Sequence, residues 1–235
     1  AAPTNLSFSS ATGSTASDNV SITFTPPTGD GVITSYTSNY GTTASTSSPC
    51  LITGLAGNKN YSMTLAATNS SGTSLASSSV AVLTRPDPPS SLSFNSSSAY
   101  DRVSINFAVP SGDGTITGYT SSVGTNTTTT TPFIVTGLTG NNTYSITFTA
   151  TNSSGTSVAS SSVSALTRPA APTIGSATAS ASSSQSATVT YTKPTGDATS
   201  YSITSSPVGG SGSGASPISV TNLTGNTSYT FTVTA

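Results

Sequence analysis

Residues Thr53–Pro86 read TGLAGNKNYSMTLAATNSSGTSLASSSVAVLTRP, and Thr136–Pro169 repeat the stretch as TGLTGNNTYSITFTATNSSGTSVASSSVSALTRP. A third, shorter version, TNLTGNTSYTFTVTA, runs from Thr221 to Ala235. The tyrosines of the three copies lie 83 and 85 residues apart. A fixed internal period is typical of a chain built from repeated structural units.

The period sets the domain organisation. About 84 residues is the size of one small domain, too long for a solenoid unit and too short for two domains. We therefore predict three domains, at residues 1–85, 86–169 and 170–235. The joints between them, Arg85–Pro89 and Arg168–Pro172, are rich in proline. Proline restricts the backbone, so these connectors are short and stiff and favour a rod-like arrangement.

Alternating apolar residues predict the secondary structure within each repeat. In the second repeat Val103, Ile105 and Phe107 fall on one face of a strand, and residues 144–150 alternate in the same way. Further strands are expected at residues 133–135 and 158–166, separated by turns rich in Gly, Asn and Asp. Six or seven such strands per repeat and no helical period indicate an all-β chain of three antiparallel β-sandwiches.

Composition excludes several classes of protein. Ser and Thr account for 98 of 235 residues, charged residues for 5%, and the net charge is −1. Five scattered Lys and Arg residues cannot form the basic stripe of a nucleic-acid-binding protein. No apolar run approaches the roughly 18 residues of a membrane span. We expect no nucleic-acid partner and no membrane span in this segment.

Cys50 is the only cysteine, which excludes a disulfide within the chain. Its repeat equivalents are Phe133 and Ile218, so it occupies an inward-facing strand position. A free cysteine behaves as a small buried hydrophobe. We expect Cys50 to pack in the core, in preference to the alternative of a reactive thiol.

The block G-L-x-G-N-x-x-Y-x-x-x-x-x-A-x-N resembles the E–F corner and F strand of fibronectin type III domains. The sequence is most similar to the fibronectin type III domains of bacterial and viral surface proteins, and the resemblance covers the whole chain. It implies a tyrosine corner, in which a tyrosine hydroxyl pins the crossover between sheets. The implied corner residues are Leu55, Leu138, Leu223, Tyr61, Tyr144 and Tyr229.

Two features depart from that family. Its usual strand B tryptophan is replaced by Phe24, Phe107 and Tyr191, each of which still supplies a large ring to the core. The chain also has no Arg-Gly-Asp sequence, so the integrin-binding loop of animal fibronectin is not implied.

The third repeat stops before its last strand. Such a sandwich exposes a sheet edge and a gap in its core, which favours pairing with another strand. In one interpretation the natural chain continues beyond Ala235, and in the other a neighbouring subunit donates the strand. The first is favoured, because the sequence offers no spare strand ahead of the first domain.

The sequence offers no chemistry for catalysis. It has no His and no Glu, so Ser-His-Asp, Cys-His and zinc arrangements are excluded. The carboxylates of Asp30, Asp113 and Asp197 are repeat equivalents, a whole domain apart, and fit turns better than a shared site. One Asp per loop is far from the oxygen ligands that calcium needs. We expect no enzyme activity, no catalytic or metal residues and no cofactor.

Asn-x-Ser/Thr sequons are frequent on this hydroxyl-rich chain, and they offer candidate sites for N-linked glycans. An alternative is that sequons arise freely in a sequence so rich in Ser and Thr. The candidate acceptors are Asn5, Asn60, Asn69, Asn95, Asn126, Asn141, Asn152, Asn222 and Asn226.

Three functions fit these observations. The leading one is a non-enzymatic structural rod in an extracellular filament, cell-surface appendage or virion fibre, with copies of itself or virion neighbours as partners. The second is an adhesin or phage-fibre module that recognises carbohydrate or a host surface. The third is a spacer within a larger secreted enzyme. All three place the chain outside the cell, on its surface or on a virion.

Overall fold

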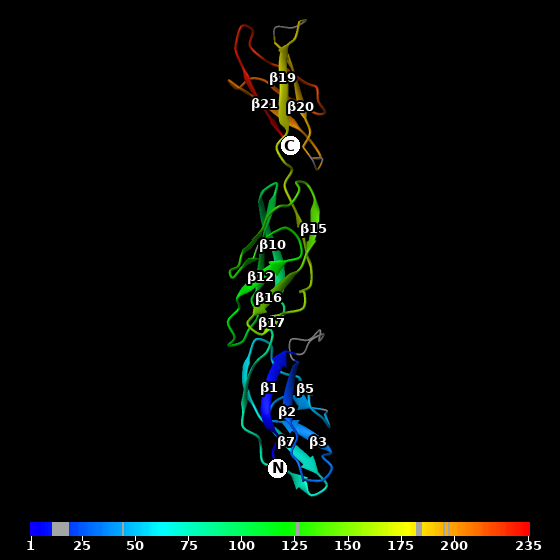
Figure 1. The fold of residues 1–235 in the computed structure, drawn as a ribbon. Helices are drawn as coiled ribbons and strands as arrows, with labels where there is room; N and C mark the ends of the chain where they lie inside the picture. The colour runs from blue at the N-terminus through cyan, green and yellow to red at the C-terminus, as the bar shows by residue number, and fades with distance from the viewer. Residues whose placement is uncertain (11–18, 44, 126, 182–184, 195, 197) are drawn as a thin grey trace.

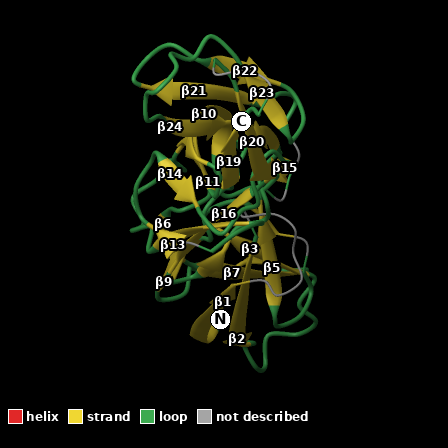
Figure 2. Cartoon of the chain, turned by 90° about the horizontal axis from the view of Figure 1, so that it is seen from above, coloured by secondary structure: helices red, strands yellow, loops and turns green. Residues whose placement is uncertain are grey.

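The computed structural model describes residues 1–235 except 11–18, 44, 126, 182–184, 195 and 197. Its strands gather into three groups that lie end to end (Figure 1). We call them bead 1 (β1–β9), bead 2 (β10–β18) and bead 3 (β19–β24). Figure 2 shows strands and loops, and the described residues contain no helix. The chain is all-β, as predicted.

Beads 1 and 2 have the same succession of strands along the chain and differ in the pairing of one short strand, since β4 pairs with β5 and β13 pairs with β12. Bead 1 contains β1 (Thr4–Ser10), β2 (Val20–Thr25), β3 (Ser35–Ser38), β4 (Thr42–Thr43), β5 (Cys50–Thr53), β6 (Asn60–Met63), β7 (Leu65–Asn69), β8 (Gly72–Thr73) and β9 (Val80–Leu83). Bead 2 contains β10 (Ser90–Ala99), β11 (Arg102–Ala108), β12 (Gly118–Ser121), β13 (Thr127–Thr128), β14 (Phe133–Val135), β15 (Thr143–Ile146), β16 (Phe148–Asn152), β17 (Gly155–Thr156) and β18 (Val163–Leu166).

All the strand pairs are antiparallel. In bead 2 one layer has the order β10-β11-β14, and the facing strands pair as β13-β12-β16-β17 and β15-β18. Bead 1 has the orders β1-β2-β5-β4, β3-β7-β8 and β6-β9. A buried apolar cluster fills the space between the two layers of each bead.

Bead 3 has fewer strands: β19 (Thr173–Ala179), β20 (Ala187–Thr192), β21 (Ser202–Ser206), β22 (Ser211–Ser213), β23 (Ile218–Val220) and β24 (Thr230–Thr234). They form the orders β19-β20-β23 and β22-β21-β24. No described strand of bead 3 takes the place that β9 and β18 occupy in the other beads. β24 is therefore an edge strand, as the unfinished third repeat predicts.

The second strand of each bead (β2, β11 and β20, called strand B) contributes buried residues to the core, as the alternation predicts. Val103, Ile105 and Phe107 are buried in β11, and the intervening Ser104 and Asn106 are less so. The rings that stand in for tryptophan are buried against a second ring in every bead. Their centroids lie 4.5 Å apart for Phe24 and Tyr36, 4.9 Å for Phe107 and Tyr119, and 4.8 Å for Tyr191 and Tyr201. Such pairs add to the stability that their burial alone provides.

Cys50 lies in β5 with no exposed surface, in the core cluster of bead 1. Its equivalents Phe133 and Ile218 are buried too, so the predicted core position is confirmed. Burial raises the pKa of the Cys50 thiol, and a hydrogen bond with Ser45 opposes this only partly. The thiolate, which is the reactive form, is therefore disfavoured.

We expect Cys50 to resist modification while bead 1 is folded. With a disulfide reagent at about pH 8, the folded chain should react at least about a hundredfold more slowly than the chain in guanidinium, because reaction requires opening of the core. The absorbance of the released thiol measures both rates. Equal rates would contradict the buried position.

The long strand predicted at residues 144–150 is two strands in the structure. β15 pairs with β18 and β16 pairs with β12, and the change of partner falls at Thr147. The Thr147 N–H donates to Ser122 Oγ at 3.0 Å instead of to a strand carbonyl. A side chain thus interrupts the ladder.

The last strand, predicted at residues 158–166, is regular only from Val163. Before Val163, the hydroxyls of two buried serines accept hydrogen bonds from the neighbouring strand. Ser160 Oγ accepts from the Phe148 N–H at 2.9 Å, and Ser157 Oγ accepts from the Ala150 N–H at 3.0 Å. Ser77 and Ser74 do the same for bead 1. These hydroxyls explain part of the serine content, because each satisfies a strand N–H that the irregular backbone leaves without a carbonyl.

Replacing Ser160 with Ala is expected to destabilise bead 2 by about 1–3 kcal/mol, because the buried Phe148 N–H loses its acceptor. Ser161→Ala, one residue away and exposed, is the matched control and should have little effect. Urea denaturation monitored by tyrosine fluorescence measures both variants. Identical midpoints for the two would show that the hydroxyl does not support the strand.

Candidate functional site

The tyrosine of each repeat pins the corner of its bead. The hydroxyls of Tyr61, Tyr144 and Tyr229 each accept a backbone N–H at 2.8 Å, from Ala56, Thr139 and Thr224 respectively. Leu55, Leu138 and Leu223 are buried beneath these turns. The corner holds the Gly-Asn turn that follows each leucine, and this turn is where the next bead docks.

Asn58 is the centre of the joint between beads 1 and 2. Its backbone is left-handed at φ 53°, and the residue is 2% exposed. Asn58 Nδ2 donates to the Gly114 carbonyl at 2.8 Å, and the Asn58 carbonyl accepts the Gly114 N–H at 2.9 Å. Its own N–H donates to the Arg85 carbonyl at 2.7 Å. The Gly-Asn turn thus links its own bead, the connector and the following bead.

Asn152 closes the joint from the side of bead 2. It lies at the end of β16 and is 3% exposed. Its Nδ2 donates to Asn58 Oδ1 at 3.1 Å and to the Thr84 carbonyl at 2.9 Å. Ser154 Oγ donates to the Leu83 carbonyl beside it. Buried polar groups that are all paired fix one geometry, since an unpaired alternative is costly.

A Gly-Asp-Gly loop of bead 2 completes the contact. The Asn60 N–H donates to Asp113 Oδ1 at 2.7 Å, and Asn60 Nδ2 donates to the same oxygen at 3.2 Å. A Cβ placed on Gly112 would lie 2.2 Å from the Asn58 carbonyl oxygen. Only glycine fits there, because the backbone approaches closely and φ is 130°.

The joint between beads 2 and 3 is built from the corresponding segments, with its closest contact one residue earlier in the Gly-Asn turn. The Asn141 N–H donates to the Arg168 carbonyl at 3.0 Å, and Asn141 has the same left-handed backbone, φ 53°. A Cβ on Gly196 would lie 1.9 Å from the Gly140 carbonyl oxygen. Asp197, the counterpart of Asp113, lies outside the described residues. The two joints therefore share one docking mode, a glycine loop of the following bead on the Gly-Asn turn of the preceding one.

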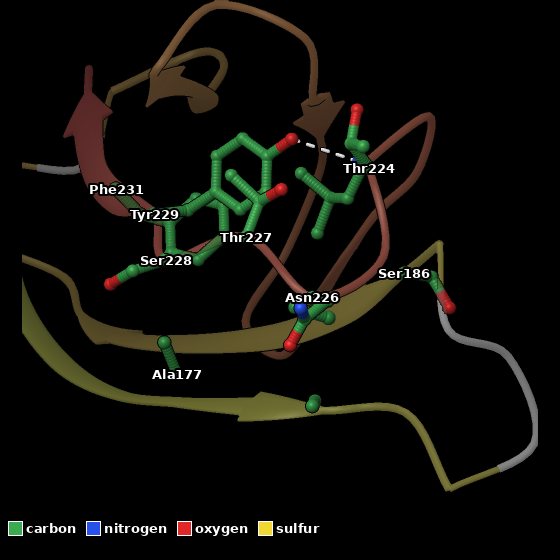
Figure 3. A pocket seen from close by; sticks show the side chains of 11 residues that line it. Ala177, Ser186, Thr224, Asn226, Thr227, Ser228, Tyr229 and Phe231 are labelled. Atoms are coloured by element: carbon green, nitrogen blue, oxygen red, sulfur yellow. Dashed lines mark hydrogen bonds between the residues drawn. The ribbon is translucent and has the colours of Figure 1, made fainter.

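The open edge of bead 3 is a second candidate site (Figure 3). A cavity of about 650 Å³ lies beside it, lined by residues that include Ala177, Leu223, Tyr229 and Phe231. Phe231 and Val233 are only half-buried, whereas Ile146 and Phe148, their equivalents, have no exposed surface. The missing strand thus leaves apolar surface that the complete beads cover.

The predicted glycan acceptors fall into different environments. Asn5, Asn60, Asn95, Asn222 and Asn226 are exposed, and Asn69 and Asn141 are half-buried. Asn126 lies outside the described residues. Asn152 differs from the rest because both hydrogens of its amide are used inside the joint, so a glycan there is incompatible with docked beads. Whether the exposed sites carry glycans stays a prediction.

The carboxylates are dispersed. Among the described residues, no three His, Cys, Asp or Glu side chains gather as they would around a metal ion. Asp30 and Asp113 both lie in glycine loops, and Asp113 accepts hydrogen bonds across the joint. In the part of the chain that the structure describes, no helix is long and apolar enough to cross a membrane.

Comparison with known proteins identifies a family for one segment of the chain. Residues 170–235 match the fibronectin type III domain. The hydrogen bond that Tyr229 makes in this segment recurs at Tyr61 in bead 1 and at Tyr144 in bead 2. Among solved structures, the crystal structure of chicken CNTN1 FN1-FN3 domains is 17% identical and covers 99% of this chain and 92% of that chain, with a TM-score of 0.31. The search of curated proteins found no match.

Sequence reasoning did not find the joint. It interpreted the Gly-Asp-Gly loops as turns and Asn152 as a glycan acceptor, and it gave Asn58 no role. The feature of the sequence that could have revealed the joint is the recurrence of one dipeptide at equivalent positions. Gly-Asn recurs at residues 57–58, 140–141 and 225–226, and a left-handed turn favours these two residue types.

Proposed function

We propose that this chain is a non-enzymatic structural protein, a rod of tandem β-sandwiches in an extracellular filament, cell-surface appendage or virion fibre. The observation that carries the proposal is the repeated joint, in which a glycine loop of the following bead docks on the Gly-Asn turn of the one before it. Contacts that repeat with the sequence propagate one geometry along the chain, and this is the property that a rod requires. Figure 1 shows the resulting end-to-end arrangement.

The low charge of the surface supports contacts between copies of this chain. With 5% charged residues, large contacts between copies bury few ions, and burying unpaired ions is the costly part of such contacts. We therefore propose filament or virion neighbours, including further copies, as the partners. A hydroxyl-rich surface and the fibronectin type III match also support a place outside the cell, on its surface or on a virion.

Small-angle scattering and sedimentation equilibrium test the rod. We expect the maximum dimension of a straight three-bead particle with little variation between conditions, and self-association as concentration rises. A chain that bends freely at both joints and stays strictly monomeric at high concentration would overturn the proposal.

A second candidate is a binding module, favoured by a pair of partly buried rings in bead 3. The rings of Tyr229 and Phe231 are stacked there, with centroids 6.2 Å apart and planes 23° apart. Partly exposed rings of this kind supply rigid contact area for a ligand such as carbohydrate. A glycan array probed with the wild type and with Phe231→Ala tests this. Signals that the variant loses would support binding at the edge, and an array with no hits would remove it. A catalytic domain in the same reading frame would favour the spacer role instead.

A further inference from the structure

In bead 2, the groove beside Gly155 holds an arginine from the preceding bead. A Cβ on Gly155, which has φ 136°, would lie 3.2 Å from Arg85 Nε and 3.5 Å from Arg85 Cδ. The residue before this glycine, Ser154, and the nearby Asn152 bond to carbonyls of bead 1. The arginine stem and the Gly-Asn turn therefore dock side by side on one end of bead 2.

At the same end of bead 1 the described residues make no such contact. Its equivalents of Gly112, Gly114 and Gly155 are Gly29, Gly31 and Gly72, and a Cβ on any of these three would meet no described atom within 4 Å. In bead 2, by contrast, each of the three glycines lies against Asn58 or Arg85. The backbone matches best beside the arginine position, where φ is 131° at Gly72 and 136° at Gly155. Gly29 and Gly112 both have positive φ, whereas Gly31 has positive φ and Gly114 does not.

The unfilled groove has chemistry suited to an arginine. It encloses about 220 Å³ beside Gly72, between Ile33 and Ala67 on the apolar side and Asp30 and Ser71 on the polar side. Apolar walls fit the arginine stem, and a carboxylate and hydroxyls fit its guanidinium. Asp30 is the repeat equivalent of Asp113, which accepts hydrogen bonds from Asn60 across the existing joint.

The side chain of Asn69 is held by the same kind of turn as that of Asn152. Asn69 Oδ1 accepts the Ser71 N–H at 2.9 Å, as Asn152 Oδ1 accepts the Ser154 N–H at 2.8 Å. Its Nδ2 donates to the Asp30 carbonyl within bead 1, whereas Asn152 Nδ2 reaches across the joint. The amide is thus held by the same turn and differs only in its acceptor.

We propose that this end of bead 1 is a docking surface for the C-terminal end of another bead of the same kind. The Gly-Asn turn of that bead lies over Gly29 and Gly31, and the arginine of its Thr-Arg-Pro tail enters the groove beside Gly72. This docking surface is separate from the proposed rod, because the rod depends on the two internal joints and these form without any bead at this end of bead 1.

A four-bead chain tests the surface. Placing a copy of residues 1–86 directly ahead of Ala1 creates the junction Thr-Arg-Pro-Ala-Ala-Pro, which is the wording of residues 167–172. Nuclear magnetic resonance relaxation should show the added bead tumbling with the rest. The Asn69 side-chain amide and the Gly72 N–H should shift, and exchange at Asn69 should slow at least about tenfold as the amide is buried.

Two variants separate the contribution of the arginine to docking from that of the Gly-Asn turn. Arg85→Ala in the added copy empties the groove, and Gly29→Val in the original bead blocks the turn; each should restore independent tumbling. Lys59→Ala in the added copy removes the same charge from an exposed side chain outside the groove and should change nothing. An added bead that tumbles independently, with Asn69 and Gly72 unshifted, overturns the docking surface. The internal joints would remain stiff in that case, so the rod itself would stand.

Discussion

Bead 3 is expected to become much more stable when residues 151–169 are appended after Ala235. The added segment continues β24 as Thr151 continues β16, and it supplies the equivalents of Val163 and Ala165 to the open edge. Covering Phe231 and Val233 and burying the incoming side chains should contribute about 3–6 kcal/mol to the free energy of unfolding. Differential scanning calorimetry should show the bead 3 transition rising by at least about 10 °C.

The control is the same extension with Asp at the positions that correspond to Val163 and Ala165. It adds equal chain length and the same turn, but it cannot enter the apolar edge. We expect its transition to match that of the unextended chain. An equal rise with both extensions would show that covering the edge is not the cause.

Gly112→Val is expected to separate beads 1 and 2 without unfolding either of them. Its side chain would collide with the Asn58 carbonyl, and the bonds of Asn58 to Gly114 and Asn152 cannot form around it. Small-angle scattering should change from a stiff to a hinged profile. Losing this buried network should remove about 2–4 kcal/mol of coupling between the unfolding of the two beads.

The matched control is Gly29→Val in the same three-bead chain. Gly29 is the repeat equivalent of Gly112 and also has positive φ, but a Cβ there meets no described atom within 4 Å. The control therefore carries the backbone strain without the collision. If it bends the rod as much as Gly112→Val does, the strain and not the docking explains the effect.

Much of the fold follows from patterns that repeat within one bead. Alternation at Val103, Ile105 and Phe107 predicts strand B, and the alignment of Cys50 with Phe133 predicts its burial. These predictions succeed because the side chains that face a core are set by local period. The split at Thr147 was missed because it depends on Ser122, 25 residues away, whose hydroxyl takes the place of a carbonyl.

The joint was beyond prediction for a similar reason. Asn152 and Asn58 lie 94 residues apart, and neither belongs to a pattern that names its partner. An asparagine followed by two serines fits a glycan acceptor as well as it fits a joint. Two asparagines with identical local sequence, Asn69 and Asn152, differ in their contacts: Asn152 Nδ2 donates to residues of bead 1, and Asn69 Nδ2 donates to the Asp30 carbonyl within its own bead.

The Asn58 contacts consist of amides and carbonyls, which carry no net charge. Dissolved ions screen attractions between charges but leave neutral hydrogen bonds nearly unchanged. Neither amides nor carbonyls gain or lose a proton between moderately acidic and moderately basic pH. The part of the bending stiffness that the Asn58 network supplies should therefore be the same in fresh water and in brine, and only the contacts of the charged Asp113 and Arg85 should respond to salt.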